Sequence, residues 1–219
     1  MERTESITVA RYPAIDRSVV VLLLSNLLTI ALAVYQHWDI YVVMWVYWGQ
    51  SVIIGYFNFR RIMDLKRFST AGFMINDQPV KPTPQTQRQT AVFFALHYGI
   101  FHLVYLGFLG ADANVAGGFP LFNVLVCIGV FYLNHWFSYR YNREQEQERV
   151  PNIGNIMFFP YIRIIPMHLM IIAGFTFLGS STRTLIIFLL MKTAADVAMH
   201  VIGHAMARSA ARRATRHLP

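Results

Sequence analysis

The chain has 219 residues, of which 55% are hydrophobic and only 14% are charged. A soluble domain carries about 25% charged residues, so this composition argues against a soluble globular protein. The formal net charge is +8, but the basic residues flank apolar runs, as they do in membrane proteins. No basic reading helix or aromatic RNA motif is present, so we expect no nucleic acid as a partner.

Six apolar stretches follow one another along the chain, each near the ~20 residues that a membrane-spanning helix needs. We expect these helices at about residues 18–36, 40–59, 90–109, 119–139, 161–178 and 184–206. The predicted fold is therefore an all-α integral membrane bundle of six transmembrane helices, forming a single domain over residues 1–219. Between the second and third helices, the prolines of segment 79–84 predict an extended linker. Segment 152–160 is apolar but short, which predicts an interfacial segment.

Lysine and arginine are concentrated in alternate connections. Connections 60–88 and 140–151 and the C-terminal tail are rich in these residues, whereas connections 110–118 and 179–183 hold at most one. Because positively charged loops stay on the cytoplasmic side, we expect the N- and C-termini and both long loops in the cytoplasm. The oligomeric state is left open, a homo-oligomer included.

Ionisable residues inside the expected spans are costly in lipid and therefore indicate function. With a rise of about 1.5 Å per residue, His97, His168 and His200 lie roughly 9 to 12 Å from the cytoplasmic ends of their helices. Asp196 and Gln50 lie near 15 Å on the same estimate. Polar groups from several helices thus reach similar depth, which predicts a site in the cytoplasmic half of the bundle.

The sixth expected helix carries a stripe of ionisable side chains. Lys192, Asp196, His200 and His204 follow one another at intervals of four residues, so they share one helix face. Imidazoles and a carboxylate at matched depth are typical ligands of first-row metals, and two histidines four residues apart occur in helical metal sites. Lys192 would balance the charge, or would form an ion pair with Asp196. The single cysteine, Cys127, excludes a thiolate cluster.

These features predict a metal-binding membrane protein, a metal-dependent oxidoreductase acting on a lipid-soluble substrate being one such function. The cofactor is one metal ion or two, of zinc, iron, copper or manganese, with Lys192 and Gln50 as further cofactor contacts. Haem b held by two facing histidines is one alternative, and a proton-coupled transporter is another. Histidines that only join helices by hydrogen bonds are a third. The expected metal ligands are His97, His168, His200, His204 and Asp196.

Two other histidines and an arginine complete the set of ionisable residues in the expected spans. His102 and His135 are evenly balanced between a site role and a structural role. Arg163, at the start of the fifth expected helix, is expected to reach the phosphate headgroups instead of the site.

Several segments resemble one family of bacterial multi-pass membrane proteins, catalogued only as a domain of unknown function (number six-four-nine-eight). The matching segments are 47–51, 54–58, 97–101, 163–168 and 192–200. The resemblance implies a shared intramembrane site and a multi-pass location in the bacterial inner membrane, and it implies no particular reaction. The family pattern has a glutamate where this chain has Gln50, so a carboxylate is missing there. The fourth helix matches poorly, so the resemblance adds nothing for His135.

Overall fold

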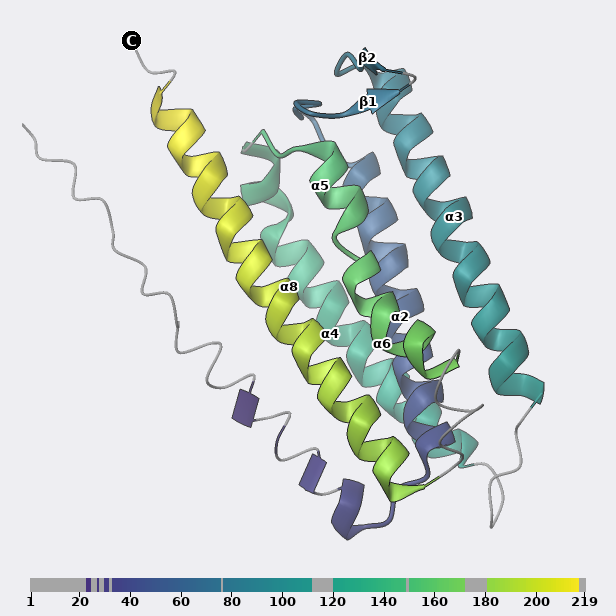
Figure 1. Cartoon of the computed structure of the whole chain (residues 1–219). Coiled ribbons are helices and arrows are strands. Elements are labelled where there is room, and N and C mark those ends of the chain that lie inside the picture. The colour runs from purple at the N-terminus through teal and green to yellow at the C-terminus, as the bar shows by residue number, and fades with distance from the viewer. Residues whose placement is uncertain are drawn as a thin grey trace, which may run out of the picture.

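The computed structural model describes residues 23–24, 27, 30–31, 33–75, 77–111, 120–148, 150–171 and 181–216. Within these ranges, the side chains of residues 75, 141–142, 144–148, 200, 203–204 and 206–216 are not described. The described chain is helical apart from one short hairpin and the connections (Figure 1).

Helix α2 (Ile40–Met63) is the central element of the bundle. Asp39 caps its first turn by accepting a hydrogen bond from the Tyr41 backbone N–H at 2.7 Å. Helices α3 (Pro84–Ala111) and α4 (Leu121–Glu148) pack along it. Two glycines of α2 permit this close packing, because a Cβ on Gly49 would overlap Ile128 of α4 and one on Gly55 would lie 2.6 Å from the Tyr98 ring of α3.

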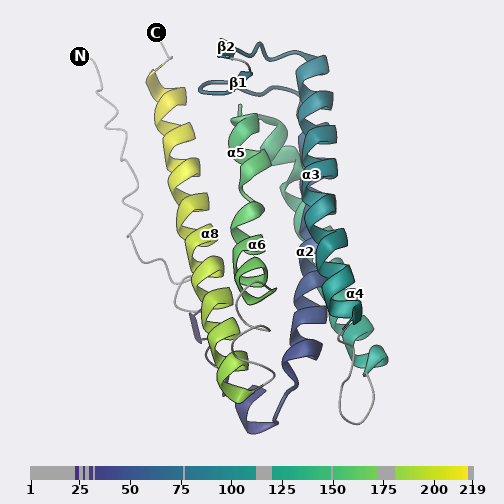
Figure 2. The same cartoon turned by 45° about the vertical axis from the view of Figure 1, so that its right-hand side comes forward.

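A broken helix lies on another side of α2. It consists of α5 (Ile153–Phe158) and α6 (Tyr161–Leu169), which are separated at residues 159–160. Pro160 lacks an N–H group and so interrupts the helical hydrogen bonding there. Asn58 of α2 holds α5 by donating to the Ile156 carbonyl at 3.1 Å. Helix α6 packs against α8 (Thr182–Arg216) and lies between α8 and α3 (Figure 2).

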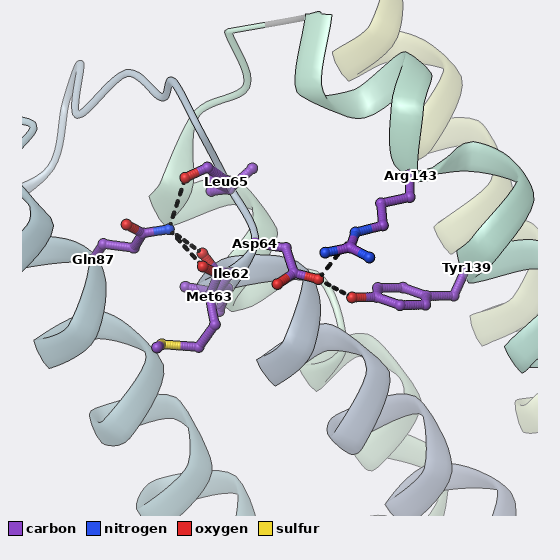
Figure 3. A network of polar contacts seen from close by, with 7 residues as sticks. All are labelled: Ile62, Met63, Asp64, Leu65, Gln87, Tyr139 and Arg143. Carbon is purple, nitrogen blue, oxygen red and sulfur yellow. Dashed lines mark hydrogen bonds and ion pairs between the residues drawn. The ribbon is translucent and has the colours of Figure 1, made fainter.

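The end of α2 near Met63 is closed by polar contacts from two other helices (Figure 3). The Gln87 amide on α3 donates to the carbonyls of Ile62, Met63 and Leu65 at 2.8 to 3.1 Å. On the opposite side, Asp64 accepts from the Tyr139 hydroxyl and pairs with Arg143 at 3.4 Å, both on α4. These contacts satisfy carbonyls that the last turn of a helix leaves open.

The long connection between α2 and α3 is partly ordered by backbone pairing. It contains a two-stranded antiparallel hairpin of β1 (Met74–Ile75) and β2 (Gln78–Pro79). Ser69 adds an isolated bridge to Asn152, which also caps α5 by accepting from the Asn155 N–H. Segment 79–84, predicted as an extended linker, holds the end of β2 and the residues that lead to Pro84.

Three helices of the described chain are long and apolar enough to cross a membrane: Ile40–Met63, Pro84–Ala111 and Leu121–Arg140. The protein is therefore a helical membrane protein, while the six-span count and the cytoplasmic termini are not established by the structure. The fifth expected span begins at Tyr161, as α6 does, and α5 lies in the preceding segment 152–160. The first expected span, 18–36, and the end of the fifth, 172–178, lie largely outside the described residues.

Candidate functional site

Two of the predicted ligands lie on one seam between α3 and α6. His97 of α3 bonds through Nδ1 to the Tyr161 hydroxyl of α6 at 2.8 Å. His168 of α6 bonds through Nδ1 to the Tyr105 hydroxyl of α3 at 3.1 Å. Each helix thus supplies one imidazole and one phenol, and the two hydrogen bonds run in opposite senses across the seam.

The Phe101 ring joins the two imidazoles. Its centroid lies 5.2 Å from that of His97 and 6.0 Å from that of His168, edge-on to both. Phe93 stacks on the other side of His97, with 5.4 Å between ring centroids and 13° between planes. We call this set of residues the histidine seam: His97, Phe101, Tyr105, Tyr161 and His168.

The histidine seam leaves one nitrogen of each ring available. In the described structure, the Nε2 atoms of His97 and His168 make no hydrogen bond to another residue. Both side chains are exposed on the outside of the bundle. An imidazole whose Nδ1–H donates to a fixed partner presents its Nε2 lone pair to a metal, and the partner fixes the ring orientation. The seam therefore has the chemistry of two pre-oriented metal ligands.

A second polar group, which we call the charged cluster, joins α6 and α8. Asp196 pairs through Oδ1 with Arg163 Nη1 at 3.2 Å and through Oδ2 with Lys192 Nζ at 2.7 Å. The Arg163, Asp196 and Lys192 side chains are 12%, 10% and 20% exposed. Both carboxylate oxygens are therefore occupied by cations in a largely buried setting.

Aromatic residues from two further helices surround Arg163. The Tyr47 hydroxyl of α2 donates to the Arg163 carbonyl at 2.9 Å. The guanidinium carbon lies 5.3 Å from the Tyr47 ring centroid and 5.9 Å from that of Phe131 on α4. Such positions over ring faces stabilise a cation. The Arg163 Nε is buried and has no hydrogen-bond partner among the described residues.

The predicted site residues therefore separate into two groups on different sides of α6. His168 faces α3, whereas Arg163, five residues earlier, faces α8 and Asp196. Five residues correspond to about 140° around a helix. Within the side chains that the structure describes, no three His, Cys, Asp or Glu residues come together as a metal-ligand group. His200 and His204 lie on α8, but their side chains are outside the described part.

One expectation about position needs correction. Arg163 does not reach toward headgroups, because it pairs with Asp196 inside the bundle. The candidate residues lie beside the first half and the middle of α2. The Arg163 carbonyl accepts from Tyr47, and Tyr98, next to His97, bonds to Ser51 at 2.8 Å.

Gln50, His102 and His135 take no part in either group. The Gln50 side chain is half-buried and makes no hydrogen bond to another described residue. His102 is 5% exposed and bonds through Nδ1 to the Tyr98 carbonyl at 2.8 Å. His135 is half-buried, with its ring against Phe57 and Phe131. Lys192 forms its predicted ion pair with Asp196.

Sequence reasoning missed the tyrosines that orient the site. Tyr47, Tyr105 and Tyr161 each bond to a residue at least 60 positions away. Their partners depend on how the helices pack, and no local spacing reveals them. Tyr161 was detectable only as a polar aromatic residue directly after Pro160.

Fold and site together define a class: an integral membrane protein with polar side chains paired inside a helical bundle. Residues 8–213 match the family of unknown function DUF6498, and the chain belongs to that family. No curated protein and no solved structure shows a significant match to the chain.

Proposed function

We propose that this protein binds transition metal ions at the histidine seam, with Nε2 of His97 as a ligand of one ion and Nε2 of His168 as a ligand of another. His97 and Tyr105, the partner of His168, are eight residues apart on α3, about 12 Å along the helix axis, so the two imidazoles lie too far apart to share one ion. The observation that carries the proposal is the paired arrangement of the seam. Two exposed imidazoles, from helices distant in sequence, are each held at Nδ1 by a tyrosine hydroxyl, so both rings are oriented without a ligand. Imidazole donors suit zinc, iron, copper and nickel.

The set of ligands differs from the one that the sequence predicts. Asp196 is unsuited to a metal, because both of its oxygens face cations and a divalent ion would be placed beside Arg163 and Lys192. A closed site needs further ligands. His200 and His204, the other predicted candidates, share the α8 face of Asp196 and not the seam, so each ion retains open positions.

The exposure of the seam supports a lipid-soluble substrate. His97 and His168 lie on the outside of a bundle whose flanking side chains, such as Leu96, Ile100 and Ile165, are exposed and apolar. Reactants dissolved in the bilayer therefore have access to the metal without crossing the bundle. The proposed activity is metal-dependent oxidation or reduction of such a molecule.

We also propose the membrane topology on which this access depends. Six spans with cytoplasmic termini, in the inner membrane of a bacterial cell, are supported by the distribution of lysine and arginine. The Met63 end of α2 then faces the cytoplasm. Cysteine labelling of the α2–α3 connection in intact and in opened cells tests this topology. We expect labelling only in opened cells, and labelling in intact cells would argue against a cytoplasmic connection.

The metal proposal is tested by cobalt(II) titration of the purified protein, followed by its visible absorption. We expect saturable binding whose stoichiometry falls in each of His97→Ala and His168→Ala and is retained in His135→Phe, the control. Tyr105→Phe and Tyr161→Phe should bind about 10 to 100 times more weakly, since they free the rings without removing a ligand. Unchanged binding in both alanine variants would contradict the proposal.

Haem b is the second candidate, favoured by the oriented imidazoles whose Nε2 atoms are open, with His97 or His168 as one axial ligand. An absorption spectrum of protein produced with ample haem distinguishes the two. A Soret band that disappears in His97→Ala or in His168→Ala supports haem, and a spectrum without that band supports the metal ion alone.

A further inference from the structure

The apolar parts of α2 and α4 end beside each other, at a place where both helices carry arginine. The apolar part of α4 ends at Arg140, and α2 ends at Met63. Asp64 joins these two ends, because it accepts from the Tyr139 hydroxyl and pairs with Arg143 (Figure 3). This part of the molecule therefore lies where the hydrocarbon of a bilayer meets the headgroups, whichever side of the membrane it faces.

Two arginines approach Asp64 from different helices. Arg143 of α4 is 49% exposed and pairs with Asp64 through Nε and not through its two outer Nη groups. Arg60, one turn before Asp64 on α2, is exposed, lies near Asp64 and donates a hydrogen bond to the Tyr56 hydroxyl. Among the described side chains, one carboxylate thus faces two arginines on the outside of the bundle.

Arg140 adds a third cation and an aromatic support. It lies three residues before Arg143, so the two share one side of α4. It is exposed, and its guanidinium carbon lies 5.2 Å from the centroid of the Trp136 ring. Trp136 and Tyr56 are themselves 36% and 48% exposed. Amphipathic rings of this kind lie at the level of the headgroups, and an arginine stacked on one is held at that level.

These three residues, which we call the boundary arginines, suit the phosphate of a membrane lipid. A guanidinium carries N–H donors in a planar fork that matches the oxygens of a phosphate. A zwitterionic headgroup brings a cation of its own, which the arginines repel, so the arrangement favours a lipid with net negative charge. Further into the span, Leu133 and Phe137 of α4 are 54% and 64% exposed, and acyl chains can lie along them.

We propose that the boundary arginines, Arg60, Arg140 and Arg143, form a binding site for an anionic phospholipid. The lipid phosphate lies between the ends of α2 and α4, and the acyl chains follow α4. A lipid held there joins the two helices at the membrane surface. The site shares no residue with the histidine seam, so it is independent of the metal proposal.

The test is native mass spectrometry of the full chain released from detergent micelles, with phosphatidylglycerol and phosphatidylcholine added at equal concentrations. We expect phosphatidylglycerol to bind first. Arg60→Gln and Arg140→Gln should each weaken its apparent affinity about tenfold, because a charged hydrogen bond is lost. Arg88→Gln is the matched control, since Arg88 is exposed on the first turns of α3, next to Gln87, which contacts the same end of α2. This variant loses the same charge and should bind phosphatidylglycerol as the wild type does.

The thermal unfolding midpoint in nanodiscs gives a second measurement. It should rise with the phosphatidylglycerol content for the wild type and for Arg88→Gln, and should rise less for Arg60→Gln/Arg140→Gln. An equal rise in this double variant overturns the proposal. Equal binding of the two lipids by the wild type, or the same loss of affinity in Arg88→Gln as in the other variants, also overturns it. An excess of inorganic phosphate should leave phosphatidylglycerol bound, and its displacement would assign the site to free phosphate instead.

Discussion

Removing the carboxylate of the charged cluster should destabilise the protein far more than removing either cation. Asp196→Leu removes the carboxylate that pairs with both Arg163 and Lys192, whose side chains are 12% and 20% exposed. Breaking a buried ion pair from one side costs about 3 to 5 kcal/mol. Arg163→Met, in contrast, leaves Asp196 paired with Lys192 at 2.7 Å and the cluster neutral.

Combining the two substitutions measures the coupling energy between Arg163 and Asp196. In Arg163→Met/Asp196→Leu only Lys192 stays charged, so the double variant should cost less than the sum of the two single variants. Coupling energies between contacting residues are about 0.5 to 3 kcal/mol, and we expect this pair near the upper end. Asp64→Asn is the matched control, because its partner Arg143 is 49% exposed and such pairs contribute at most about 1 kcal/mol.

The assay is reversible unfolding in mixed micelles by increasing sodium dodecyl sulfate, from which the free energy of unfolding is obtained for each variant. The expected order of destabilisation is Asp196→Leu first, then Arg163→Met, then Asp64→Asn. Equal losses for Asp196→Leu and Arg163→Met, or strictly additive single and double variants, would refute the electrostatic account of the charged cluster.

Three further outcomes follow from the packing. Gly55→Ala should lower the free energy of unfolding by about 1 to 3 kcal/mol, because its Cβ meets the Tyr98 ring at 2.6 Å; the same assay measures it, and a stabilised variant would be inconsistent with this contact. Gln87→Met should cost about 1 to 3 kcal/mol by leaving carbonyls at the end of α2 unsatisfied, and Gln87→Glu should not restore them, since a carboxylate has no N–H. Asn152→Ala should lower the free energy of unfolding by about 1 kcal/mol, because the cap of α5 is lost. Proteolysis of the 64–83 connection should become faster. An unchanged cleavage rate would contradict the role of Asn152 in holding this connection.

The helices that coincide with long apolar stretches could be predicted from the sequence. Helix α2 begins at Ile40, where the second span was expected. Helix α3 covers the third stretch and extends beyond it, and α4 begins at Leu121 within the fourth stretch and extends beyond its end. Their extensions are polar and lie outside any hydropathy signal. The break between α5 and α6 was harder to predict, because Pro160 follows a short apolar segment that reads equally well as an interfacial one.

The sequence predicted which residues form the candidate site better than it predicted how they are arranged in space. The cost of an ionisable group in lipid identified His97, His168, Lys192 and Asp196, and each has a polar partner in the structure. Axial depth alone could not reveal that His168 and Arg163, the partner of Asp196, lie on different sides of α6. That separation depends on the rotation of α6 about its axis, which is set by contacts with Tyr105 and Tyr47.

The metal content of the purified protein tests the central claim most directly. Elemental analysis of the wild type should give a transition metal in a fixed ratio to protein, and His97→Ala and His168→Ala should each reduce that ratio strongly while His135→Phe leaves it unchanged. A wild-type protein with metal only at background level, or a ratio that is unaffected in both alanine variants, would contradict the assignment of the histidine seam.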